Sequence, residues 1–160
     1  MRTIYIETSI VSYLTARPSR DLLAAAWQSA TSDWWETQRQ RFEIFTSQLV
    51  LDEAGEGNPE AAQRRLYALA GIPLLSMPEP TTDLAEALLV SGALPTKAAD
   101  DALHIAVCAY HGVDYLLTWN CRHIDNAETK PMMRRVCALH GYTCPEICVP
   151  LELMGETDDR

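Results

Sequence analysis

At four places in the sequence, a carboxylate or an amide stands beside a segment predicted to be a strand or helix of the core. Glu7 directly follows an apolar run, Glu53 lies on a short helical segment after a second run, and Asn120 follows a third. Asp100 and Asp101 open an apolar helical stretch. Carboxylates that converge without a Lys or Arg partner repel one another, and a divalent cation removes that repulsion. Oxygen ligands favour Mg²⁺ or Mn²⁺, which can activate water and hold phosphoryl oxygens for in-line attack.

Each of these residues also has a structural explanation when it is taken alone. Acids near a helix N-terminus, such as Asp100 and Asp101, are stabilised by about 0.3–1 kcal/mol through the helix dipole. Glu53 fits a solvated helix acid, and Asn120 fits a turn residue. The helix that follows the two aspartates is apolar on nearly all sides, so at least one of them is expected to face an enclosed space. Glu7 is the hardest to explain structurally, because it directly follows a core strand.

The elements that must position these residues alternate between strands and helices. Strands are predicted at residues 3–6, 41–46, 73–77, 114–118 and 144–149. Helices are predicted at residues 23–34, 48–53, 59–70, 84–89, 97–111 and 129–140. Strands separated by helices need crossover connections, which predicts an α/β fold, a three-layer α/β/α sandwich with a mostly parallel central sheet. In such sheets, ligands bind outside the carboxyl ends of the strands, where the strand order reverses.

Length, composition and cysteine pattern bound the class of protein. The 160 residues, 48% of them apolar, predict a single domain over 1–154 and a frayed polar tail over 155–160. No apolar run is long enough to span a membrane and the start does not resemble a secretory signal peptide, so we expect a cytoplasmic protein. The five cysteines are odd in number and scattered, which favours free thiols over disulfides or a zinc site.

The net charge of −9 argues against tight nonspecific binding of nucleic acid by the whole surface. It leaves open a local site at which a metal ion carries the positive charge, and it leaves open a basic partner. The chain contains neither a G-x-G-x-x-G nor a Walker A sequence, which removes the two commonest nucleotide-binding classes.

Four short motifs, taken together, resemble the PIN-domain family and, within it, the VapC-like toxins of type II toxin–antitoxin systems. They are YIETS at 5–9, SQLVLDE at 47–53, DALHIA at 101–106 and LTWN at 117–120. Each is weak alone, whereas four in the right order on the right elements are fairly specific. The resemblance implies a compact PIN-like α/β/α fold and a hydrolase, a Mg²⁺- or Mn²⁺-dependent endoribonuclease that cleaves single-stranded or structured RNA.

Residue by residue, the resemblance implies that Glu7, Glu53 and Asp101 are the acidic metal-site and catalytic residues. It places Asn120 at the fourth position of that site. Two of these four residues depart from the family pattern, which usually has Asp where this chain has Glu7 and often has Asp where it has Asn120. Glutamate reaches one methylene further, and Asn120 lowers the negative charge of the site by one. Both changes are compatible with magnesium.

The same resemblance implies supporting residues around the acids. Thr8 or Ser9 is expected to orient the first carboxylate or a metal-bound water, and Asp100 is a second candidate beside the motif aspartate. His104 and His111 are interpreted as structural, because each lies within or at the end of an apolar helix.

Residues within and after the last motif are candidate RNA contacts. Trp119 could stack on a base. The local concentration of basic side chains comprises Arg122, His123, Lys130, Arg134 and Arg135. Arg134 and Arg135 equally fit the solvated face of an amphipathic helix.

Trp34 and Trp35 are neighbours and cannot both point the same way, so one of them is a candidate contact for a partner. The expected partners are an RNA substrate, a cognate antitoxin protein and a second copy of the chain, and no membrane.

Two further function classes compete with a metal-dependent endoribonuclease. A PIN-like module without catalysis, used in binding or assembly, would account for the departures at Glu7 and Asn120. A metal phosphohydrolase acting on another phosphoester would need a strand-end aspartyl nucleophile, whereas the first strand ends in glutamate.

Overall fold

The computed structural model describes residues 1–155, and its centre is a five-stranded sheet in which every pair of neighbouring strands is parallel. The strands are β1 (Arg2–Ile6), β2 (Phe42–Ser47), β3 (Leu74–Leu75), β4 (Tyr115–Leu117) and β5 (Glu146–Cys148). They are ordered β3-β2-β1-β4-β5 across the sheet. The predicted α/β class with a parallel sheet is confirmed.

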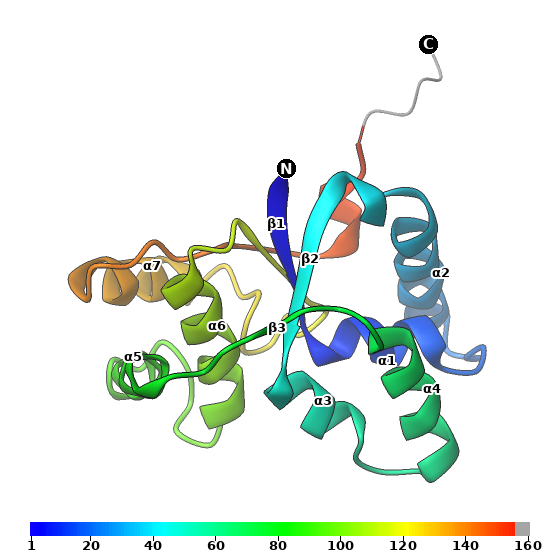
Figure 1. Ribbon diagram of the computed structural model, residues 1–160, viewed down its shortest axis with the longest axis horizontal. Coiled ribbons are helices and arrows are strands. Elements are labelled where there is room, and N and C mark those ends of the chain that lie inside the picture. Colours follow the sequence, from blue (N-terminus) through cyan, green and yellow to red (C-terminus); the bar gives the residue numbers. More distant parts are fainter. Residues whose placement is uncertain (156–160) are drawn as a thin grey trace.

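Seven α-helices flank the sheet within the described residues. They are α1 (Thr8–Thr15), α2 (Leu22–Thr37), α3 (Gln48–Ala54), α4 (Pro59–Leu69), α5 (Glu79–Val90), α6 (Ala99–His111) and α7 (Lys130–Leu139). Two short 3₁₀ turns are η1 (Arg39–Arg41) and η2 (Pro150–Leu153). Figure 1 shows α5, α6 and α7 on one side of the strands and α1 to α4 on the other, as expected for three layers.

The order of the strands reverses direction at β1. The chain adds β2 and β3 on one side of β1, and β4 and β5 then follow on the other side. The register sets Ile6 opposite Leu117, the last residues of β1 and β4. The backbone N–H of Glu7 donates to the carbonyl of Leu117 at 3.2 Å. The residues after β1 and β4 therefore lie side by side at the switch point, where ligands bind in sheets of this kind.

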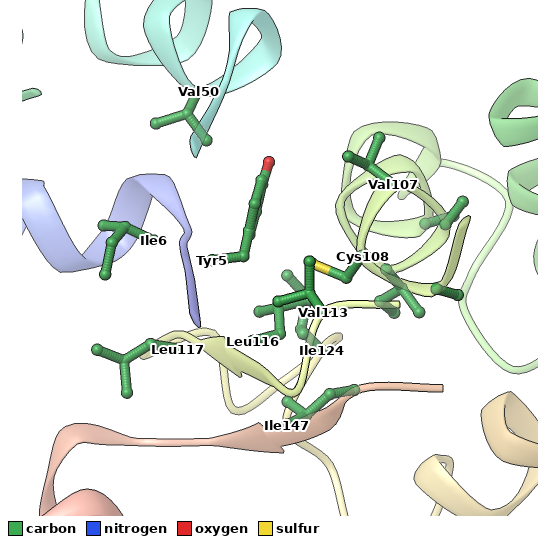
Figure 2. Packing of buried hydrophobic residues seen from close by; sticks show 14 of the residues in the cluster. Tyr5, Ile6, Val50, Val107, Cys108, Val113, Leu116, Leu117, Ile124 and Ile147 are labelled. Carbon is green, nitrogen blue, oxygen red and sulfur yellow. The ribbon is translucent and has the colours of Figure 1, made fainter. Parts of the chain in front are cut away.

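Strand β1 is buried on both faces, which explains its unbroken apolar sequence. Ile4, Tyr5 and Ile6 have no exposed surface. Figure 2 shows the ring of Tyr5 directed into the space between the helices that carry Val50 and Val107. Core packing thus holds the strand that leads into Glu7.

Helix α1 is not among the elements predicted from the sequence. The chain enters it directly from β1, and the side chain of Glu7 caps it by accepting a hydrogen bond from the backbone N–H of Ser9. A side-chain N-cap ends the strand and starts the helix without any glycine. The helix has eight residues, of which Ile10 and Val11 are buried, and so short a segment shows no clear apolar period.

The third predicted strand, at 73–77, is shorter than expected. Only Leu74 and Leu75 pair with β2. Pro73 and Pro78 stand on either side, and proline has no N–H to donate to a strand ladder.

Two helix faces also differ from expectation. The spacing of Ala62, Leu66 and Leu69 in the sequence predicts the buried face of α4, but Leu66 is 39% exposed, whereas Ala62 and Leu69 are buried. In α2, Trp34 is fully buried and Trp35 is half-buried, with the guanidinium of Arg39 4.5 Å above the Trp35 ring. Neither tryptophan is therefore fully open to a partner, because the core covers Trp34 and Arg39 covers part of Trp35.

The predicted polar tail begins at Gly155, whose backbone N–H donates to the side chain of Gln38 at 3.0 Å. Residues 156–160 of that tail lie outside the described residues. Across the part of the chain that the structure describes, no helix is both long and apolar enough to cross a bilayer.

Candidate metal centre

Glu7 lies at the switch point in a setting of hydroxyl and amide donors. Its Oε1 accepts hydrogen bonds from the hydroxyls of Ser9 and Thr118, both at 2.5 Å. Its Oε2 accepts a hydrogen bond from the backbone N–H of Ser9 at 3.1 Å. The residue is 5% exposed. Its position at the N-terminus of α1 favours a negative charge, and the hydrogen bonds fix the direction of the carboxylate.

The two hydroxyls around Glu7 tie α1 to the segment after β4. The Ser9 hydroxyl accepts a hydrogen bond from the backbone N–H of Trp119 at 2.8 Å. The Thr118 hydroxyl accepts one from the backbone N–H of Asn120 at 2.9 Å. Because both hydroxyls are oriented by these backbone donors, their own protons point at Glu7. Ser9 thus orients the first carboxylate.

Glu53 reaches the same edge from α3, which starts at the N-cap Ser47. Its Oε1 accepts a hydrogen bond from the Thr8 hydroxyl at 2.6 Å and lies 2.6 Å from Nε2 of His104. Burial raises the pKa of the Glu53 carboxyl, but the hydrogen bond and charge of His104 and the bond from Thr8 outweigh burial, and the pKa is lowered. Thr8 therefore serves the second carboxylate and Ser9 the first.

His104 lies on α6 with no exposed surface and is hydrogen-bonded on both sides of its ring. Its Nδ1 lies 2.7 Å from the Tyr5 hydroxyl, which in turn lies 2.7 Å from the Ser47 hydroxyl. Burial lowers the pKa of His104, but the bond to Glu53 and the charges of nearby carboxylates raise it, and the net shift is upward. From the sequence we interpreted His104 as structural. Its place three residues after Asp101, on the same helical face, is the signal that could have placed it at the site.

Asp101 and Asp100 both lie in the first turn of α6. They line a cavity of about 320 Å³ together with Glu53 and Lys97. Asp101 Oδ2 is 2.9 Å from Nδ1 of His123, and both side chains are about one-fifth exposed. Asp100 is exposed. Asp101 therefore faces the cavity beside Glu53, as the motif position implies.

Asn120 shapes the turn after β4. Its side-chain oxygen accepts a hydrogen bond from the backbone N–H of His123 at 3.0 Å. Its backbone carbonyl accepts from Ile124 and Asp125, at 3.1 and 2.8 Å. This turn brings His123 back toward Asp101, so Asn120 stabilises the turn at the edge of the site.

The donor atoms fit a hard divalent cation. Oxygens of Glu7 and Glu53 and a nitrogen of His104 lie within 4.8 Å of one another. Asp101 falls outside this group. Among residues 1–155, no Lys or Arg forms an ion pair with Glu7, Glu53 or Asp101. A buried carboxylate without a cationic partner is costly, and carboxylate oxygens are the ligands that Mg²⁺ and Mn²⁺ prefer.

The prediction that Trp119 stacks on a base is wrong. Trp119 is 4% exposed, and its ring stacks on Trp27 at a centroid distance of 4.6 Å. Its Nε1–H donates to the Thr31 hydroxyl at 2.7 Å. The ring is therefore part of the packing between α2 and the β4 edge and is closed to RNA.

The predicted basic contacts are divided between ion pairs and open positions. Lys130 pairs with Asp125 at 2.6 Å, and Arg134 lies 3.8 Å from Glu146. Arg122 is exposed on the turn after β4. His123 is the predicted basic contact whose ring lies against a carboxylate of the site, that of Asp101.

The fold and the site together define an α/β protein that gathers carboxylates at the switch point of a parallel sheet, where such folds bind ligands. The PIN domain model matches residues 4–127, and the chain belongs to the PIN domain family. The matched segment runs from β1 to the turn after β4 and includes all four predicted acid and amide positions. Members of this family are generally metal-dependent nucleases that act on RNA. No curated protein matches this chain.

Proposed function

We propose that this protein is a Mg²⁺- or Mn²⁺-dependent endoribonuclease that hydrolyses phosphodiester bonds in RNA. The observation that carries the proposal is Glu7: an almost fully buried carboxylate, oriented by two hydroxyls and an amide, with no Lys or Arg ion pair among the described residues. It stands beside Glu53 at the switch point of the sheet. Membership of the PIN domain family supports the same reading.

In this proposal Glu7, Glu53 and Asp101 hold the cation, and Asn120 supports the turn that closes the site. A bound divalent cation supplies positive charge that stabilises phosphoryl oxygens and makes water a better nucleophile. Ser9 and Thr118 fix the direction of the Glu7 carboxylate by donating hydrogen bonds to it, and Thr8 does the same for Glu53. The cavity beside Asp101 is the opening through which a phosphodiester would reach the carboxylates.

The test is cleavage of a labelled single-stranded RNA by the purified protein with Mg²⁺ or Mn²⁺ and with EDTA. We expect cleavage that EDTA abolishes and that Asp101→Ala abolishes without unfolding the protein. Asp52→Asn is the matched control, because Asp52 is an exposed acid next to Glu53 on the same helix. Cleavage that persists in EDTA would contradict a metal-dependent mechanism.

The alternative is a PIN-like binding or assembly module with weak catalysis or none. Its support is that the side-chain oxygen of Asn120 is already used by its own turn, and that Glu7 replaces the usual aspartate. Calorimetry with Mn²⁺ separates the two functions: no binding at millimolar Mn²⁺ favours the module.

Within the ribonuclease proposal, the four motifs favour a VapC-like toxin that acts in the cytoplasm and is neutralised by a cognate antitoxin. Support for a protein partner is an apolar cavity of about 630 Å³ between α1, α2 and α4. Its lining includes Leu14, Trp35 and Tyr67, and Tyr67 is 85% exposed. The test is co-purification with the product of a small neighbouring reading frame. Scattering that shows a dimer of the chain alone would assign the surface to a second copy instead.

A further inference from the structure

We infer that His104 is a positioning residue, which holds Glu53 for the cation and does not itself ligate it. The inference rests on the proposed function in one respect, that Glu53 is a metal ligand. It goes beyond that function because His104 lies in the same 4.8 Å group as the two carboxylates and has the chemistry of a ligand. Four observations on the ring and its partners carry it.

The first observation is the bond to Glu53. His104 Nε2 lies 2.6 Å from Glu53 Oε1, and the Thr8 hydroxyl donates to the same oxygen at 2.6 Å. An ionised carboxylate can only accept hydrogen bonds, so Nε2 must carry the proton of this contact. A ring nitrogen that carries a proton has no lone pair for a metal ion. While this bond is made, the nitrogen nearest the site is closed to the cation.

The second observation is the anchor on the far side of the ring. Nδ1 lies 2.7 Å from the Tyr5 hydroxyl, and that hydroxyl lies 2.7 Å from the Ser47 hydroxyl. In a neutral ring, Nδ1 accepts from Tyr5, which accepts from Ser47. In a protonated ring, Nδ1 donates to the Tyr5 hydroxyl, which then donates to the Ser47 hydroxyl. Nε2 donates to Glu53 in either state, so the anchor fixes the ring without depending on its charge.

The third observation is burial. His104 has no exposed surface and Tyr5 has none, whereas the Glu53 side chain is 24% exposed. The ring cannot turn without breaking its hydrogen bonds to Tyr5 and Glu53, which is costly because neither the ring nor the Tyr5 hydroxyl could reach water. The bonds link β1, α3 and α6, so the carboxylate at the edge of the site is held by the interior of the protein.

The fourth observation is which oxygen of Glu53 is used. Thr8 and His104 both bond Oε1, and among residues 1–155 no hydrogen-bond partner contacts Oε2. Oε1 is therefore held from inside while Oε2 is left for a cation. A histidine that donates to a metal-binding carboxylate in this way sets its direction, as outer contacts of metal sites commonly do.

The experiment measures Mn²⁺ binding to the RNA-free protein by calorimetry, well below the melting temperature of every variant. We expect His104→Leu to weaken Mn²⁺ binding by about 10-fold or more, the range found for outer contacts of metal sites. His104→Gln should restore most of the affinity, because its amide N–H can still donate to Glu53. Tyr5→Phe, which removes only the anchor of the ring, should give a smaller loss. His140→Leu, at an exposed position after α7, is the control for loss of a histidine.

Pulsed electron paramagnetic resonance on the Mn²⁺ complex provides the second readout. We expect no strong coupling of the manganese to a histidine nitrogen in the wild-type protein. Strong coupling that disappears in His104→Leu would show direct ligation and overturn the inference. Unchanged Mn²⁺ affinity in His104→Leu, or in both His104→Gln and Tyr5→Phe if the leucine variant does not fold, would also overturn it and leave a structural role. If the wild-type protein bound no Mn²⁺, the metal centre itself would be wrong, and with it this role.

Discussion

At both ends of the β1–β4 pair, a carboxylate that accepts hydrogen bonds joins the two strands, but the ends differ in the charged side chains beside that carboxylate. At the amino end, Asp114 accepts hydrogen bonds from the backbone N–H and the hydroxyl of Thr3, at 2.9 and 3.1 Å, and Arg2 lies 3.6 Å away. At the carboxyl end, Glu7 accepts from Thr118 and Ser9, and no arginine or lysine pairs with it among the described residues. Each end thus clamps one strand to the other with a carboxylate and a hydroxyl.

The difference shows which carboxylate is structural and which is available for chemistry. Asp114 is at the edge where a parallel sheet binds no ligand, is about one-third exposed, and has an arginine nearby. Glu7 is buried at the switch point beside Glu53. Two neighbouring carboxylates, one of them buried, are unfavourable unless a cation neutralises their charge. The candidate metal site is therefore marked less by its acids than by the lack of a lysine or arginine ion pair with them among the described residues.

The largest expected effect separates the two carboxylates by activity. Glu7→Gln should reduce RNA cleavage by at least about a hundredfold, because several kcal/mol of charge stabilisation depend on the cation that Glu7 holds. Asp114→Asn should leave cleavage within about threefold of wild type, a change of less than about 0.7 kcal/mol in the barrier. Initial rates on the same RNA measure both. Equal losses in the two variants would mean that the comparison reflects folding rather than chemistry.

The second expected effect is stabilisation by metal. Mn²⁺ at a hundred times its dissociation constant should stabilise the wild-type protein by about 2.7 kcal/mol, because the ion binds only the folded state. Asp114→Asn should gain the same amount, and Glu7→Gln should gain much less. Thermal unfolding with and without Mn²⁺ measures this gain. A full gain in Glu7→Gln would place the cation elsewhere.

The third expected effect concerns stability without metal. Asp114→Ala should lower the free energy of unfolding by about 1 kcal/mol, since it removes two hydrogen bonds to a charged group whose partial exposure weakens them. Denaturant titration in EDTA measures the loss. An unchanged midpoint would show that the amino end of the strand pair needs no clamp.

The fourth expected effect is the pH dependence of that contribution. The hydrogen bond from the Thr3 backbone holds the pKa of Asp114 below its ordinary value of 3.8, with smaller help from the Thr3 hydroxyl and Arg2 against the effect of burial. A lowered folded-state pKa stabilises the protein above pH 3.8, and this stabilisation is lost as the pH falls through the lowered pKa. The difference in stability between wild type and Asp114→Asn should therefore shrink below about pH 4. A difference that grows on acidification would reverse the sign and refute the assignment.

The smallest expected effect is on RNA affinity. Arg122→Gln should weaken binding of single-stranded RNA to the Asp101→Ala protein about two- to threefold and lower the salt dependence by about one phosphate contact. Arg20→Gln, which removes an exposed charge before α2, is the matched control. Fluorescence anisotropy at several salt concentrations measures both. The same loss in the two variants would indicate a general effect of net charge.

Much of the site could be predicted because parallel strands end at the same edge. Glu7 directly follows β1 and Asn120 lies three residues after the end of β4, so their proximity follows from the strand–helix alternation alone. Asp101 could be placed because α6 begins at that edge and leads back into β4 (Figure 1). The start of α1 was missed because Glu7 caps it, and a glutamate at a strand end carries no clear signal for a helix start.

The sequence by itself determined the class of fold, the edge at which the carboxylates gather and the excess of negative charge there. Only the tertiary structure decided which group serves which acid. Thr8 bonds Glu53 across 45 positions of sequence, and Thr118 bonds Glu7 across 111. The same long-range packing buried Trp119 against Trp27 and set His104 behind Glu53. Local patterns report periodicity and caps, whereas these contacts depend on how whole elements approach one another, and no single segment encodes that.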